Sequence, residues 1–358
     1  MSDVDLSALL DPKVTRLLMT IPLKPLQGDR FQPTGFPSLG AATYQTKHGT
    51  KLIVESPQSM ANRLEKTCWD DATNEPIAPL AGISHVTVRR GKEEKVLAKK
   101  AFLTNSMLEA HRINSPYLLE GSDKSFRNDI TSELGVLADG PIDRGLLAKV
   151  LLKYDIGSLI HGVFLAKPYL AGGRLRVARA LSAVIEASDA NVAPYGGVKN
   201  DHVNPSGDTG KGFGNVPFAR DDFVANQIDL FINLDLAQIR GYGLDDNVQK
   251  LLILLSLYKV RKLIDGDLRL RTACDLEPID RKTVKAMRPA GFILPDLTDL
   301  ETALSSSIKE CKDKDGKSLM TQKIVAFDDE LKKRKDKPEA DGEKDDETNG
   351  ENETPNDE

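Results

Sequence analysis

Alternating apolar residues identify the best-defined strand of this 358-residue chain. The apolar side chains occupy every second position, at Ile228, Leu230, Ile232, Leu234 and Leu236, which places them on one face of a strand. Residues 244–265 then follow helical spacing, with acidic residues in the first turn and basic residues in the last, as the helix macrodipole favours. Residues 266–276 (GDLRLRTACDL) return to alternation and predict a further strand. The three segments predict a strand-helix-strand unit of the type from which ferredoxin-like sheets are built.

A second strand-helix step lies nearer the N-terminus. Residues 51–55 (KLIVE) predict a short strand, and residues 56–67 (SPQSMANRLEKT) predict a helix with Ser56 as its N-cap and Pro57 at its first position. Basic and amide side chains at spacings of three and four share one face of this helix. That face is either a binding surface or an ordinary solvated one.

The middle of the chain predicts a helix followed by a buried strand. Residues 141–154 (PIDRGLLAKVLLKY) have the helical pattern, and residues 157–166 (GSLIHGVFLA) read as the strand. We expect His161 in that strand to be packed in the core rather than to act as a ligand or base. A basic run at residues 89–100 (RRGKEEKVLAKK) predicts a hairpin arm.

Residues 189–223 form a long segment with six glycines, and we expect it to be an irregular loop. Loops longer than about 15 residues are usually functional or disordered, so this one is either a ligand-binding element or a tolerated surface insertion. Its GDTGKGFG run lacks the Ser or Thr that a phosphate-binding P-loop needs after Lys211. Its KGFGNVPF run matches an RNA-recognition pattern except at Asn215, which replaces a stacking aromatic. What remains is the inference that Phe213 and Phe218 can stack bases from a loop.

Composition limits the class of protein. The chain is 40% hydrophobic, enough for a sizeable core, and has no apolar run near the roughly 18 residues of a membrane span. Its three cysteines lie far apart, and its histidines show no metal-binding spacing. We therefore expect a cytoplasmic protein outside the membrane, with no disulfide framework, metal, cofactor or catalytic constellation.

The charge is distributed unevenly. Residues 328–358 hold 14 acidic and 6 basic residues, a net charge of −8, which leaves +3 for residues 1–327. The acidic end lacks the apolar residues needed to form a core and is predicted to be a disordered tail. Residues 140–220 hold 10 basic and 6 acidic residues and are the most positive sizeable part of the body.

Four phrases together resemble one protein family. They are ESPQSMANRLE (residues 55–65), HRINSPYLLEG (111–121), RVARALSAVIEASDA (176–190) and GFGNVPFAR (212–220). The chain from about residue 9 to about residue 319 is similar to the backbone subunit of the type I-U (also called I-G) CRISPR Cascade effector, within the RAMP superfamily.

This resemblance implies an α+β fold, in which a modified RRM or ferredoxin-like palm carries inserted finger and thumb elements. A single body would span residues 1–327, with a finger-like part at about 83–103, a thumb-like part at about 189–223, and the tail at 328–358. Such a subunit polymerises along a CRISPR guide RNA and presents it for pairing with target DNA. Its partners would be guide RNA, target DNA through the guide, copies of itself and other Cascade subunits.

The same resemblance, with the basic pattern, indicates which residues contact RNA. The expected set is Asn62, Arg63, Lys66, Arg174, Arg176, Arg179, Lys199, Lys211, Arg220 and the stacking residue Phe213. Two other functions stay open. One is a metal-dependent RNA endonuclease that uses Asp201 and Asp208, and the other is a scaffold protein that does not bind nucleic acid.

Overall fold

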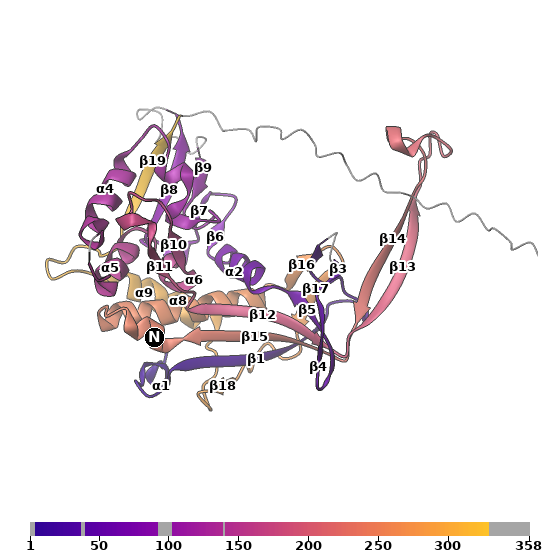
Figure 1. Ribbon diagram of the computed structural model, residues 1–358. Helices are drawn as coiled ribbons and strands as arrows, with labels where there is room; N and C mark the ends of the chain where they lie inside the picture. The colour runs from indigo at the N-terminus through magenta and orange to yellow at the C-terminus, as the bar shows by residue number, and fades with distance from the viewer. Residues whose placement is uncertain (1–3, 37–39, 92–101, 139, 329–358) are drawn as a thin grey trace, which may run out of the picture.

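A curled antiparallel sheet forms the centre of the protein (Figure 1). The computed structural model describes residues 4–36, 40–91, 102–138 and 140–328. In spatial order the central strands are β16 (Leu268–Arg271), β17 (Cys274–Pro278), β1 (Arg16–Pro25), β15 (Gln227–Asp235), β12 (Leu181–Ser188), β5 (Gly49–Glu55) and β4 (Thr43–Thr46), and β18 (Ala286–Arg288) pairs with β1. The described part of the chain therefore has a mixed, α+β architecture.

One face of this sheet is apolar because its strands alternate. Met19 of β1 lies opposite Ile232 of β15, and Ile185 of β12 lies opposite Leu230. These residues are buried and belong to one hydrophobic cluster with the helices α2 (Pro57–Lys66) and α8 (Asp246–Asp265). The predicted strand at β15, the long helix at α8 and the strand-helix step of β5 and α2 are confirmed.

A second, smaller body lies beside the sheet. It contains a three-stranded sheet of β19 (Gln322–Phe327), β8 (His85–Arg90) and β9 (Phe102–Asn105), in which β19 and β8 run parallel. Around it are α3 (Pro116–Leu119), α4 (Ser125–Leu134), α5 (Arg144–Tyr154), α6 (Gly157–His161) and the hairpin of β10 (Val163–Leu165) and β11 (Leu175–Val177). The remaining elements are α1 (Ser7–Leu10), α7 (Leu236–Gly241), α9 (Leu297–Glu310), β2 (Gly35–Phe36), β3 (Gly40–Ala41), β6 (Trp69–Asp70), β7 (Glu75–Pro76) and the short 3₁₀ turns Ala78–Leu80, Arg112–Asn114, Gly135–Leu137, Ala171–Gly173 and Thr209–Lys211.

The glycine-rich segment at 189–223 contains a two-stranded ribbon, so the prediction of an irregular loop is wrong except at the ribbon tip, residues 200–215. Strands β13 (Asn191–Lys199) and β14 (Val216–Val224) pair over nine residues each and extend the β12–β15 hairpin away from the body (Figure 1). A Cβ at Gly197 would lie 3.1 Å from the Phe218 ring, so the glycine lets that ring rest against the opposite strand. Glycine and proline residues interrupt the alternation that would identify β13 and β14 as strands in the sequence. The two strands form because their backbone groups pair with each other where they continue the β12–β15 hairpin.

Two other predicted strands also differ from the observed structure. The segment 157–166 begins as helix α6 and becomes strand β10 only after Gly162, whose φ of +80° breaks the helix. The segment 266–276 is a hairpin of β16 and β17 that turns at Ala273, where φ is +60°.

Some predictions lie partly or wholly beyond the described residues. Most of the basic arm at 89–100 falls in the undescribed segment 92–101, and all but the first residue of the acidic tail lies in 329–358. The domain boundaries stay a prediction. None of the helices within the described ranges is long and apolar enough to cross a membrane.

Candidate nucleic-acid interface

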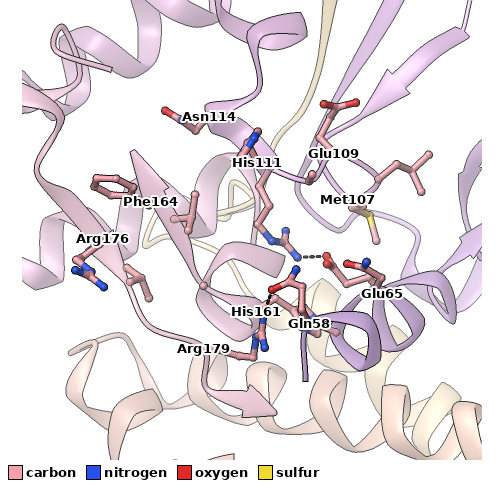
Figure 2. Close-up of a pocket in the computed structure, with 18 of the residues that line it drawn as sticks. Gln58, Glu65, Met107, Glu109, His111, Asn114, His161, Phe164, Arg176 and Arg179 are labelled. Atoms are coloured by element: carbon pink, nitrogen blue, oxygen red, sulfur yellow. Dashed lines mark hydrogen bonds and ion pairs between the residues drawn. The ribbon is translucent and has the colours of Figure 1, made fainter. Parts of the chain in front are cut away.

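A groove of about 1040 Å³ runs between helix α2, the segment 107–116 and the β10–β11 hairpin (Figure 2). The segments that line it are distant in sequence. They meet because α2 packs on the central sheet while the hairpin belongs to the smaller body. The groove therefore follows the junction of the two.

Helix α2 supplies one wall. It starts at the N-cap Ser56, whose Oγ accepts a hydrogen bond from the backbone N–H of Ser59 at 3.3 Å. Met60 and Leu64 are buried toward the sheet. The opposite side of the helix presents Asn62 and Lys66 to the groove, along with neighbouring polar residues.

The β10–β11 hairpin supplies another wall. Its two strands pair Leu165 with Leu175 and Phe164 with Arg176. The leucine pair is buried and the other pair is exposed, as alternation along paired strands requires. Just after β11, Arg179 donates hydrogen bonds from Nη1 to the backbone oxygen of Pro57 at 3.1 Å and from Nη2 to Gln58 Oε1 at 2.8 Å. This side chain ties the hairpin wall to the start of α2.

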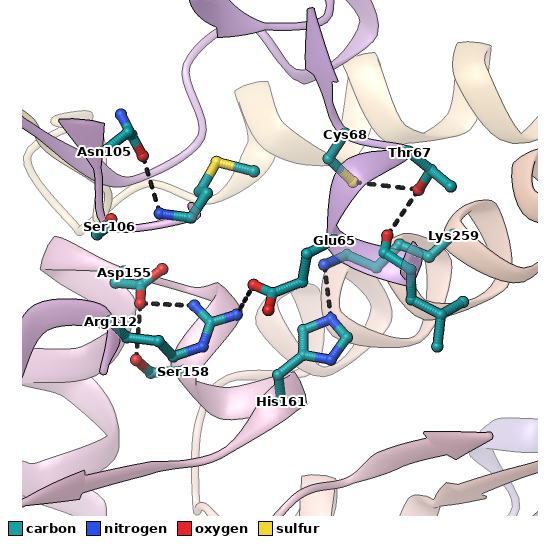
Figure 3. Close-up of polar contacts among 12 residues, drawn as sticks. Glu65, Thr67, Cys68, Asn105, Ser106, Arg112, Asp155, Ser158, His161 and Lys259 are labelled. Atoms are coloured by element: carbon teal, nitrogen blue, oxygen red, sulfur yellow. Dashed lines mark hydrogen bonds and ion pairs between the residues drawn. The ribbon is translucent and has the colours of Figure 1, made fainter. Parts of the chain in front are cut away.

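Arg112 forms a charged layer at the floor of the groove (Figure 3). Its Nη1 donates to Asp155 Oδ2 at 2.8 Å, and its Nη2 pairs with Glu65. Ser158 Oγ donates to the same Asp155 oxygen at 2.7 Å. The Arg112 and Asp155 side chains are 5% and 0% exposed, so the two charges are held almost without water. This arrangement fixes the floor of the groove.

A buried Lys259–His161 pair lies beside that layer. Lys259 Nζ is 2.8 Å from His161 Nε2, and both residues are buried (Figure 3). Burial lowers the pKa of His161 well below its usual value and lowers the pKa of Lys259 to about 8. His161 is therefore neutral at pH 7 and accepts the lysine hydrogen bond. The expectation of a packed histidine is confirmed, although its element is a helix.

The groove is lined by more basic than acidic side chains. Its lining includes Lys66, Arg112, Lys167, Arg176 and Arg179, against Glu65 and Glu109. Glu65 is already paired with Arg112, and Glu109 accepts hydrogen bonds from the Thr104 and Ser115 hydroxyls at 2.6 and 2.7 Å. Lys66 and Lys167 in turn pair with Asp71 and Glu120. Among the described residues, Arg176 and Arg179 are the lining cations without a carboxylate partner, and their two charges favour an anionic ligand.

Comparison with known proteins agrees with the sequence resemblance. Residues 17–192 match the model of the family described as CRISPR-associated protein GSU0053. This chain is a CRISPR-associated protein. A search of curated proteins by sequence finds no match to it.

Solved structures similar to this CRISPR-associated protein include two that cover most of its chain. One is a chain of a structure described as "CRISPR RNA-guided surveillance complex, pre-nicking", with a TM-score of 0.37, 13% identity, and coverage of 74% of this chain and 73% of that one. The other is Csc2 of Thermofilum pendens, with a TM-score of 0.31, 11% identity, and coverage of 87% and 80%.

The groove of the CRISPR-associated protein brings together four of the predicted RNA-contacting residues. They are Asn62, Lys66, Arg176 and Arg179. Two others make intramolecular contacts elsewhere. Arg63 pairs with Glu55 at 3.2 Å and donates to backbone oxygens of β16. Arg174 donates to backbone oxygens of residues 137, 138 and 140. Neither residue lines the groove.

The other predicted residues lie on the ribbon, apart from the groove. Lys199 and Arg220 are exposed on its strands, and Lys211 and Phe213 are exposed near its tip. Lys211 Nζ lies 3.5 Å from Asp208 Oδ2. The ribbon and the groove are thus two separate candidate surfaces.

The aspartates of the nuclease alternative organise the ribbon tip. Asp201 accepts hydrogen bonds from the backbone N–H groups of Val203, Asn204 and Gly214, at 2.9, 3.1 and 2.8 Å, and these bonds lower its pKa. Asp208 accepts from the Gly210 N–H at 3.0 Å. No group of three or more metal-ligating side chains occurs in the described ranges. Turn geometry therefore accounts for the contacts of both carboxylates.

Sequence reasoning did not identify His111, Phe164 and Lys167 in the groove lining. His111 opens one of the phrases that carry the family resemblance, which was a usable signal. The sequence carries no such signal for Phe164. Residues 157–166 are predicted to be a buried strand, and only the pairing with Arg176 places the Phe164 side chain in the groove.

Proposed function

We propose that this CRISPR-associated protein is a non-catalytic backbone subunit of a type I-U/I-G Cascade complex, and that its groove holds the guide-RNA backbone. The observation that carries the proposal is that Arg176 and Arg179 line the groove without a carboxylate partner among the described residues. Phosphate contacts by such side chains supply most sequence-independent affinity for nucleic acid. A guide-binding subunit requires that kind of affinity, since pairing of bases reads the target.

The strand order supports an RRM-like palm. Strands β17, β1, β15 and β12 are neighbours in that order and pair antiparallel, with α2 in the connection from β1 to β12 and α8 in the connection from β15 to β17. This is the split βαβ arrangement of ferredoxin-like folds. On this basis the β13–β14 ribbon is the thumb, and β8 and β9 flank the finger.

The open face of the sheet is a poorer RNA site than the groove. Its cations are paired across neighbouring strands, with Arg16 on Asp235 at 2.8 Å and Lys24 on Glu277 at 3.2 Å. A phosphate there would have to displace carboxylates. The groove also contains paired cations, Lys66 and Lys167, but within the described residues Arg176 and Arg179 have no carboxylate to displace, so the groove is the better candidate for the guide.

The first test is co-expression of the full chain with and without a CRISPR array. We expect sizing chromatography to show a larger species with a raised 260 to 280 nm absorbance ratio only when the array is present. An RNA-free species of unchanged size in both cases would support the scaffold alternative and refute the proposal.

The second test locates the RNA. The Arg176→Ala variant should lower the salt slope of RNA binding by about 1, whereas Arg16→Ala on the open face should leave it unchanged. The opposite result would move the RNA to the sheet face.

The third test addresses catalysis. Incubation of the assembled complex with complementary RNA and Mg²⁺ should give no cuts. Periodic cuts that disappear in the Asp201→Ala or Asp208→Ala variant would instead establish the nuclease.

A further inference from the structure

We propose that Phe164 and Arg176 form a nucleotide subsite on the hairpin wall of the groove, in which Phe164 stacks one base of a single strand and Arg176 contacts an adjoining phosphate. The inference rests on the proposed function and adds a base-binding site to a groove so far described through its charges. It also assigns stacking to the body of the protein rather than to the ribbon.

Strand alternation forces Phe164 outward. Leu165 and Leu175 fill the core side of the hairpin and are 0% exposed, which fixes the register. Phe164 then has to lie on the groove side, where it is 55% exposed (Figure 2). Its ring is held by a paired strand, so a ligand would lose little entropy in ordering it.

Arg176 is the cross-strand partner of Phe164 and shares its face. Opposite residues in paired strands have Cβ atoms about 5 Å apart, a spacing within which a base and its phosphate reach neighbouring side chains. The Arg176 side chain is exposed and makes no hydrogen bond or ion pair with any other residue that the structure describes. The pair thus offers a free aromatic surface beside a free guanidinium.

The surroundings favour a nucleotide over a protein segment. The exposed large apolar side chains in the groove lining are Phe164 and Leu108, and they come from different elements. Two separated side chains do not make the contiguous apolar patch typical of a protein-docking surface. Single-stranded nucleic acid is bound by aromatic side chains beside basic ones, and Phe164 with Arg176 supplies that combination here.

Phe213 on the ribbon provides a matched control. It is 54% exposed, almost the same as Phe164. Its neighbour Lys211 lies near Asp208 rather than free. A variant of each phenylalanine therefore removes an equally exposed ring from a different setting.

The experiment uses the full chain and RNA oligonucleotides with 2-aminopurine at successive positions. We expect stacking to quench the fluorescence at one position of each bound segment. Phe164→Ala should abolish this quenching and weaken binding about 5- to 150-fold, the usual effect of losing one stacked base. The salt slope should stay the same, because no phosphate contact is lost. Phe164→Trp should keep the quenching, and Phe213→Ala should not change it.

A second variant guards against misfolding. Phe164→Leu keeps the apolar bulk of the hairpin but removes the aromatic face, and it too should lose the quenching while its thermal unfolding stays like that of the wild type. If both Phe164 variants bind and quench like the wild type, the subsite is refuted while the groove function stands. Unchanged quenching with loss of subunit assembly would also refute it and make Phe164 a protein contact. Absence of RNA binding by the wild type would refute the proposed function itself.

Discussion

Replacement of Arg112 by methionine should destabilise the protein strongly. The guanidinium bridges Asp155 and Glu65 at the groove floor, and the Arg112 side chain is 5% exposed. Methionine fills similar volume but leaves two carboxylates without their partner. Removal of one member of a buried ion pair costs about 3–5 kcal/mol, a large part of the roughly 5–15 kcal/mol that stabilises a folded domain.

Urea unfolding followed by circular dichroism at pH 7 measures this loss. The midpoint should fall while the slope stays constant, because the surface exposed on unfolding is unchanged. The matched control is Arg269→Met. Its side chain is 79% exposed and lies 3.9 Å from Asp275, so we expect a change within about 0.5 kcal/mol.

A second change tests the assigned cause. Adding Asp155→Asn to the Arg112→Met variant removes one of the stranded charges and should recover part of the lost stability. A loss below about 1 kcal/mol for Arg112→Met alone, or no recovery in the double variant, would refute the reasoning that uncompensated carboxylates cause the effect.

Two further predictions follow from burial and from the ribbon. Burial lowers the pKa of His85 from 6.5 to about 4. As the pH falls, His85 therefore takes up a proton in the unfolded chain before it does so in the folded one. About 3 kcal/mol of folding stability that is present above pH 6.5 is lost as the pH falls to about 4. Urea unfolding across this range should show a flatter pH profile for His85→Gln, and identical profiles would contradict the assignment. If the ribbon also contacts RNA, combined alanine substitution of Lys199, Lys211 and Arg220 should lower the salt slope by up to about 3. Unchanged affinity and slope would exclude the ribbon from RNA contact.

Local periodicity was enough to predict several elements. The alternating residues of β15, the capped start of α2 at Ser56 and the charge-biased ends of α8 each carry a signal within one segment. Such local signals do not predict an element that forms only by pairing with a distant segment. The glycine-rich ribbon pairs β13 with β14 over a distance that no local pattern spans, and its glycines imitate a loop.

The sequence predicted the kinds of residue in the candidate site but not which of them lie together. Positive charge and side-chain spacing pointed to Asn62, Lys66, Arg176 and Arg179, and all four line one groove. The same criteria also selected Arg174, whose guanidinium instead binds backbone oxygens of residues 137, 138 and 140. Charge in the sequence does not show whether a carbonyl or a carboxylate lies within reach of an arginine.

By itself the sequence determined the mixed α+β class, the resemblance to a CRISPR-associated family and the basic character of the middle of the chain. Tertiary structure decided which basic side chains converge and which are used internally. The reason is physical: the groove joins residues from about 58 to about 179 through sheet order and packing, which depend on contacts between distant segments. Phe164 shows this most clearly, because only its pairing with Arg176 makes an apolar residue of a predicted core strand an exposed aromatic that lines the groove.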